Sequence, residues 1–164
     1  MVCDGLGGEW PTRAAVAVSP NDAVRPQQRW GMVLKRAEQS MLQAKASALK
    51  PSGLTVAQYV ALDTLQAEPG ITAASLARAC LITPQAILVV LNALDERGLV
   101  SRRSHPRHPT VLELRLTDVG EEALHGARKL VLPVERRLDE ALPEPDRRKL
   151  TDLLGRVIDA SESV

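Results

Sequence analysis

The chain has 164 residues, of which 45% are hydrophobic and only 2% aromatic, with no Phe and a net charge of +1. This length supports one domain with a hydrophobic core, and a core of Leu, Val, Ile and Ala favours packed helices over a β-sandwich. The near-zero net charge excludes a broadly basic surface, so any contact with nucleic acid must be confined to a small patch.

The N-terminal residues 1–25 carry Gly, Pro, Ser and small side chains without a sustained period, which predicts a flexible tail. Their start has neither the basic nor the apolar segment of a signal peptide, and no run reaches the roughly 18 apolar residues of a membrane span. The two cysteines, Cys3 and Cys80, do not make a disulfide framework. We therefore expect a cytoplasmic protein that does not contact a membrane.

Two helices are predicted in the first half of the chain. Apolar side chains recur at steps of three and four over residues 27–49 and predict a long first helix. Thr55 and Gln58 then form a capping-box pattern, in which each side chain bonds the backbone N–H of the other residue. This pattern predicts a second helix that ends near residue 67.

Two shorter helices follow, and each opens on a Thr. Thr72 predicts the N-cap of a helix that runs through Ala79. Thr83 predicts the N-cap of the next helix, with Pro84 at the first helical position, where its missing N–H costs nothing. Gly98 predicts the end of that helix, because glycine readily adopts the left-handed conformation of a C-terminal cap.

Two short strands are predicted after these helices, over residues 99–103 and 111–116, and the second alternates apolar and polar side chains. The loop between them, residues 104–109, contains His, Pro and Arg. This order of helix, turn, helix and basic hairpin predicts a winged helix-turn-helix, in which the second helix enters the major groove of DNA.

Two further helices are predicted over residues 117–141 and 145–160, each apolar along one stripe. The middle of the chain is too small to cover these stripes and that of the first helix, so we expect a two-fold homodimer with two DNA-reading heads. The expected fold is mainly α with a small β-hairpin wing, flanked by long dimerisation helices. The expected division of residues 26–164 is a DNA-binding core over 53–116 and dimerisation helices over 27–50 and 117–160.

The predicted DNA surface has suitable chemistry. Gln85 can pair bidentately with adenine, while Ala86 and Val89 can meet thymine methyl groups. Thr83 and the open N–H groups beside it can bind a phosphate, although Thr83 and Pro84 can also serve as helix caps alone. The candidate contacts from the hairpin are Arg102, Arg103, His105, Arg107 and His108.

Other kinds of site are less well supported. His105 and His108 have H-x-x-H spacing, but no Cys or carboxylate stands nearby at ligand spacing, so we expect no metal and no cofactor. No nucleophile–base pair or phosphate loop is evident, so an enzyme is not expected. Candidate residues for a small ligand could equally be core or dimer contacts. They are Trp30, Leu34, Met41 and Tyr59.

Three motifs stand out between residues 27 and 160: LTVAQYVALDTL, ITAASLARACLITPQAILVVLNALDERGLVSRR and LRLTDVGEEAL. As a set they resemble the MarR family of bacterial transcription regulators. The resemblance implies a homodimer that binds a near-palindromic operator on double-stranded DNA, most often as a repressor. It also implies, in many members, release from DNA when a small aromatic or phenolic compound binds.

The chain departs from the family pattern in its reading helix, which has Leu88 and Val89 where the family usually has a polar or basic residue. A winged-helix module that binds a protein partner through these apolar side chains therefore stays open as an alternative. At the wing, His105 and His108 predict that DNA affinity falls as pH rises, because neutral imidazole loses its attraction to phosphate.

Overall fold

The computed structural model describes residues 29–105 and 108–163, with the backbone alone at 105 and 108–111. The predicted tail over residues 1–25 lies outside the described residues. The elements are α1 (Trp30–Leu49), η2 (Lys50–Ser52), α2 (Val56–Ala67), α3 (Ala73–Ala79), α4 (Pro84–Glu96), β1 (Val100–His105), β2 (His108–Leu116), α5 (Asp118–Ala141) and α6 (Glu144–Glu162). Two compact units divide the chain, residues 1–37 and 38–164.

Threonine hydroxyls begin four of the helices. Thr55, Thr72, Thr83 and Thr117 each accept a hydrogen bond from the backbone N–H three residues further on, at 3.0–3.2 Å. At Thr55 the capping box is complete, because its own N–H donates to the Gln58 side chain at 2.9 Å. These local hydrogen bonds satisfy N–H groups that have no partner inside the helix, and they confirm the predicted starts of α2, α3 and α4.

The hairpin forms an antiparallel sheet of two strands, with Val100 opposite Leu116 and a register shift between Ser104 and His105. A short third segment adds to its outer edge, since Gly70 N–H donates to Leu114 O at 2.9 Å and Leu114 N–H donates to Ile71 O at 3.0 Å. This pairing ties the loop between α2 and α3 to β2.

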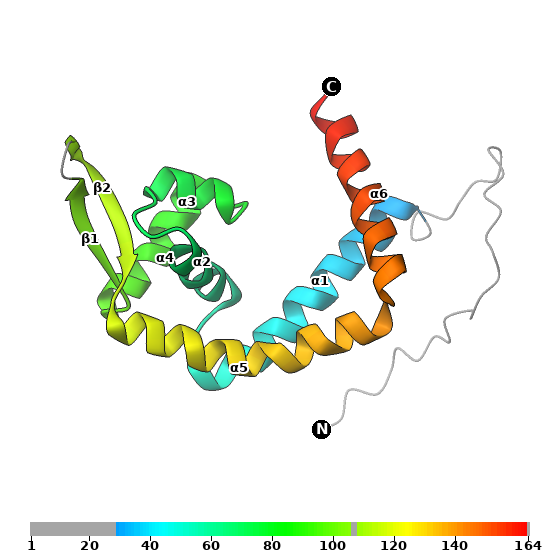
Figure 1. Cartoon of the computed structure of the whole chain (residues 1–164), viewed down its shortest axis with the longest axis horizontal. Helices are drawn as coiled ribbons and strands as arrows, with labels where there is room; N and C mark the ends of the chain where they lie inside the picture. Colours follow the sequence, from blue (N-terminus) through cyan, green and yellow to red (C-terminus); the bar gives the residue numbers. More distant parts are fainter. Residues whose placement is uncertain (1–28, 106–107, 164) are drawn as a thin grey trace. The chain divides into compact units, whose positions relative to one another are not determined.

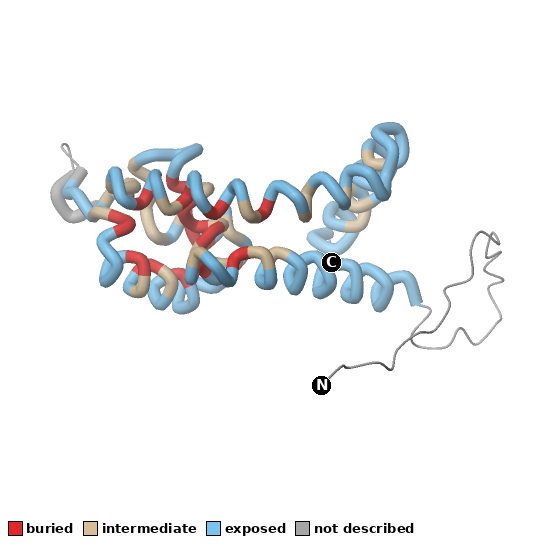
Figure 2. Tube along the Cα trace, turned by 90° about the horizontal axis from the view of Figure 1, so that it is seen from below, coloured by how far each residue is buried: buried red, intermediate tan, exposed pale blue. Residues whose placement is uncertain are grey.

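The core lies where α2, α3 and α4 pack together with the hairpin and the first half of α5 (Figure 1). Its largest fully buried side chains are Leu49, Leu62, Leu65, Leu76, Ile87, Leu91, Leu94, Leu114, Leu124 and Val131. Figure 2 shows buried positions gathered in this region, whereas α6 has no buried residue along its length.

The mainly helical fold with a hairpin wing is confirmed, but one predicted boundary is wrong. The predicted loop over residues 104–109 is shorter, because strand pairing continues through His105 and His108. Polar and proline residues marked this stretch as a loop, yet backbone pairing with the opposite strand extends the hairpin there. Within the described residues, no single helix is long and apolar enough to cross a membrane; α3 and α4 meet that test only as a pair bent by 108°.

Candidate DNA interface and ligand pocket

Helix α4 is anchored on one side and open on the other. Ile87, Leu91 and Leu94 are buried in the core at the helical spacing of three and four residues. Gln85 and Val89 lie on the exposed side, together with the capping residues at the start of the helix. The arrangement leaves the N-terminal half of α4 accessible to a large partner such as a DNA groove.

The turn that leads into α4 holds a strained residue. Leu81 N–H donates to Arg78 O at 3.1 Å and Ile82 N–H donates to Ala77 O at 3.0 Å, the pattern of a Schellman motif. Leu81 occupies the left-handed position of this motif, with φ of 54°, and is 91% exposed. At the end of α4 the same motif places Gly98 at that position, with φ of 67°, as the sequence predicts.

The arginines near the hairpin differ in whether they bond to other parts of the fold. Arg97 donates to the carbonyl of Gly53 at 3.0 Å, which ties the end of α4 to the turn before α2. Arg102 donates to the side-chain oxygen of Asn92 at 3.0 Å and lies 3.5 Å from the carboxylate of Asp95. Arg102, predicted as a phosphate contact, is therefore already tied to the exposed side of α4, while Arg103 is exposed on β1.

The wing candidates His105, Arg107 and His108 have side chains outside the described residues. Their roles, including the pH effect expected of the two histidines, stay predictions. Among the side chains that the structure does describe, no group of three or more His, Cys, Asp or Glu is arranged to hold a metal ion.

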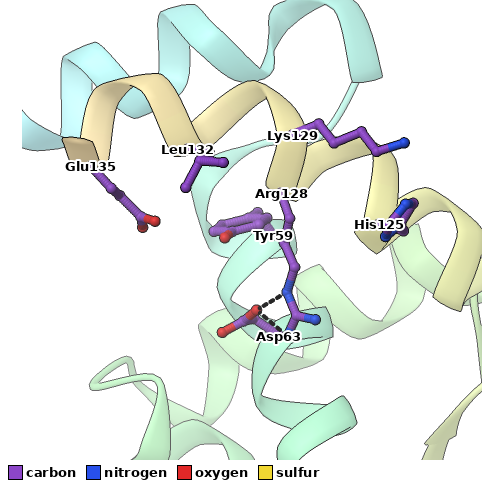
Figure 3. A pocket seen from close by; sticks show the side chains of 7 residues that line it. All are labelled: Tyr59, Asp63, His125, Arg128, Lys129, Leu132 and Glu135. Carbon is purple, nitrogen blue, oxygen red and sulfur yellow. Dashed lines mark hydrogen bonds and ion pairs between the residues drawn. The ribbon is translucent and has the colours of Figure 1, made fainter. Parts of the chain in front are cut away.

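A pocket of about 440 Å³ lies between α2 and α5. Figure 3 shows the Tyr59 ring at its centre, near Leu132 and the ion pair between Arg128 and Asp63. That pair joins α5 to α2, with the Arg128 Nη2–Asp63 Oδ1 distance at 2.8 Å and a second contact through Nε at 2.9 Å. The complete lining is Tyr59, Asp63, His125, Arg128, Lys129, Leu132 and Glu135.

The electrostatics of the pocket keep Tyr59 neutral. Burial raises the pKa of its phenol, the carboxylates of Asp63 and Glu135 raise it further, and Arg128 acts in the opposite direction. Tyr59 therefore presents a phenol O–H that can donate or accept a hydrogen bond. The acidic groups of the lining have cationic partners, since Glu135 pairs with Lys45 at 3.2 Å and Asp63 with Arg128.

The pocket contains one of the four residues predicted to bind a ligand. Tyr59 lines it, whereas Met41 is exposed on α1 and is absent from the lining. Trp30 and Leu34 are exposed in the separate unit of residues 1–37. Sequence reasoning missed the charged residues of α5, because charges spaced along a helix usually mark a solvated face.

The thiol of Cys80 is half-buried at the end of α3. Its sulfur lies 3.8 Å from the hydroxyl of Thr64. Burial raises the pKa of this thiol, and the Thr64 hydrogen bond lowers it by less. A thiol with a raised pKa is a poor nucleophile at neutral pH, which agrees with a packing role.

Comparison with known proteins identifies the family to which this fold belongs. Residues 52–108 match the model of the MarR family. The HTH-type transcriptional repressor Rv2887 of Mycobacterium tuberculosis is 31% identical over 127 residues, which cover 77% of this chain and 91% of the repressor. The chain belongs to the MarR family. It is thus a winged helix-turn-helix regulator of transcription that binds DNA.

Solved structures of MarR proteins share this fold. The transcriptional repressor CouR, bound to a 23-mer DNA duplex, is 33% identical with a TM-score of 0.72, and the match covers 79% of this chain and 92% of CouR. Rv2887 of Mycobacterium tuberculosis in complex with salicylic acid is 30% identical with a TM-score of 0.62, over 78% of this chain and 95% of that protein.

Proposed function

We propose that this MarR protein is a homodimeric repressor whose binding to a near-palindromic operator is relieved by a small aromatic ligand with an acidic group. The observation that carries the proposal is the exposed N-terminal half of α4, capped by Thr83 and held in place by a buried opposite face. In this proposal the protein works in the cytoplasm and catalyses no reaction.

The proposed DNA contacts follow from the positions of the side chains. Gln85 reads a base edge, and Thr83 with the first N–H groups of α4 holds a phosphate. Arg103 and the wing contact the backbone or the minor groove. The full proposed set is Thr83, Pro84, Gln85, Ala86, Val89, Arg102, Arg103, His105, Arg107 and His108.

Dimerisation is proposed from apolar side chains that the single chain leaves in contact with water. In α6 these include Leu150, Leu153 and Ile158, and in α1 they include Trp30 and Met32. Exposed apolar residues at this density mark an interaction surface. A second copy related by a two-fold axis buries the same residues on both partners and presents two recognition helices to the two halves of an operator.

The ligand is proposed to bind in the pocket between α2 and α5. Tyr59 and Leu132 offer an aromatic and an apolar contact. Lys129 and His125 supply cationic or N–H donor groups for an acid, while Arg128 is shared with Asp63. The bound acid competes with Asp63 for Arg128 and so disturbs the connection between α5 and the DNA-binding core. The salicylic acid complex of Rv2887 supports this class of ligand.

The test uses duplexes selected by the purified protein from a randomised library. We expect selective enrichment, affinity that falls steeply with salt, and a mass in solution of two chains. Salicylate should weaken binding of the selected duplex, whereas neutral benzyl alcohol should not, and Lys129→Gln should reduce the effect of salicylate. Failure to enrich any duplex would refute the proposal and favour the protein-partner alternative. If salicylate and benzyl alcohol released the duplex equally well, the proposed need for an acidic group on the ligand would be refuted.

A further inference from the structure

The centre of the exposed face of α4 is apolar, which its packing in the fold does not explain. Val89 is 70% exposed and Leu88 49% exposed. Helical spacing places Gln85 one turn before them and Asn92 one turn after them on the same side. Val is also a weaker helix former than Lys, Arg or Gln, so neither burial nor helix propensity favours these residues.

We propose that Leu88 and Val89 determine operator specificity by contacting the C5-methyl groups of thymine. The proposal rests on the proposed function, in which α4 lies in the major groove. Thymine methyl groups are the apolar feature of that groove, where the other base atoms are hydrogen-bond donors or acceptors. The branched aliphatic side chains of Leu88 and Val89 match this feature. They cannot hydrogen-bond a polar base edge, so they favour thymine over the other bases.

The charges around the apolar pair favour DNA as the occupant. Asp95, which would repel phosphate, lies 3.5 Å from the guanidinium of Arg102. The same guanidinium donates to the side-chain oxygen of Asn92 at 3.0 Å, so the Asn92 amide keeps its N–H donors for a base or a phosphate. Arg102 therefore neutralises Asp95 and orients the Asn92 amide beside the apolar centre. Hydrogen-bonding groups then flank the apolar pair on both sides, as mixed base and methyl contacts require.

The test compares thymine with uracil, which differs only by the missing methyl group. A duplex enriched by the wild-type protein from a randomised library is synthesised with thymine and with deoxyuridine at every thymine position. We expect each lost methyl contact to weaken binding by about fourfold. Val89→Ala and Leu88→Ala should bind the thymine duplex more weakly and should each lose part of the discrimination between the two duplexes. The matched control is Val119→Ala, an apolar residue at the start of α5 that is 58% exposed, and this variant should discriminate like the wild type.

The outcomes separate this inference from the proposed function. Equal wild-type affinity for the thymine and uracil duplexes overturns the inference that Leu88 and Val89 contact thymine methyl groups. Enrichment of a duplex would still support DNA binding. Variants that lose affinity but keep the full discrimination also overturn it, because the methyl groups are then read elsewhere. No enrichment by the wild type overturns the proposed function itself and favours a protein partner on this face. The uracil comparison needs no variant, so it holds even if a substitution disturbs folding.

Discussion

Replacing Gly120 by Ala should destabilise the protein, although Ala is the better helix former. Gly120 is buried in the first turn of α5, where a Cβ would lie 2.0 Å from the backbone O of Leu99 and 3.0 Å from its carbonyl carbon. Contacts below 3.0 Å are essentially never found. Because the obstacle is backbone, α5 and the start of β1 must separate by about 1 Å to admit the methyl group.

The cost follows from what that separation breaks. Thr117 links the two segments, since its hydroxyl donates to Gly98 O at 2.6 Å and its N–H donates to Leu99 O at 3.2 Å. Weakening these hydrogen bonds costs about 0.5–1.5 kcal/mol each, and overpacking a close contact costs about 1–3 kcal/mol. The higher helix propensity of Ala offsets about 1 kcal/mol of this cost. The net loss should be about 1–5 kcal/mol, which at its upper end is a large part of a typical free energy of unfolding.

Urea unfolding at fixed protein concentration measures this loss, because a dimer's stability depends on concentration. The matched control is Gly126→Ala in the same helix, where nothing lies within 4 Å of the added Cβ. It should gain up to about 1 kcal/mol from helix propensity. If Gly120→Ala were as stable as Gly126→Ala, the close approach of α5 to Leu99 would be wrong.

Further predictions concern the turn, the reading helix and the thiol. Leu81→Gly should raise the free energy of unfolding by about 1 kcal/mol, because Leu pays a steric penalty at positive φ; thermal unfolding that shows no gain would contradict the strain. Gln85→Ala should weaken binding to a selected duplex by about 1–3 kcal/mol and leave nonspecific binding almost unchanged; an equal loss on both would assign Gln85 to phosphate. Since the pKa of Cys80 is raised in the fold, stability from its neutral thiol is present at lower pH and is lost as pH rises past the unfolded value of about 9. Between pH 8 and 10 the free energy of unfolding, measured by urea titration at each pH, should therefore fall more steeply for the wild type than for Cys80→Ala. Equal dependence on pH in the two proteins would contradict the raised pKa.

The parts of the fold that the sequence predicts are those governed by short-range hydrogen bonds. Thr55, Thr72 and Thr83 bond N–H groups only three residues away, so their capping roles are visible in a local pattern. Gly98 is predicted for the same reason, since its conformation depends on the turn that it ends. Leu81 adopts a nearly identical conformation against its own preference, because the packing of α3 and α4 determines the turn.

The pocket could not be predicted because it is formed by residues that lie far apart in the sequence. Asp63 and Arg128 are separated by 65 positions in the sequence and meet only when α2 packs on α5. The apolar stripe of α5 indicates which side is buried, as Leu124 and Val131 show. It does not indicate which charged neighbours of that stripe face a second helix and which face water. Tyr59 is the one lining residue among the ligand candidates from the sequence, which lie on the first predicted helix and its neighbours.

Whether α4 reads DNA is decided by the affinity of the wild type and of Gln85→Ala for a selected duplex, measured across a series of salt concentrations. We expect the logarithm of the wild-type affinity to fall linearly with the logarithm of salt concentration, with a slope that reflects several phosphate contacts. Gln85→Ala should keep this slope and lose affinity by about 1–3 kcal/mol at every salt concentration. Wild-type binding that ignores salt, or a variant indistinguishable from the wild type on the selected duplex, would contradict the proposal that α4 reads DNA.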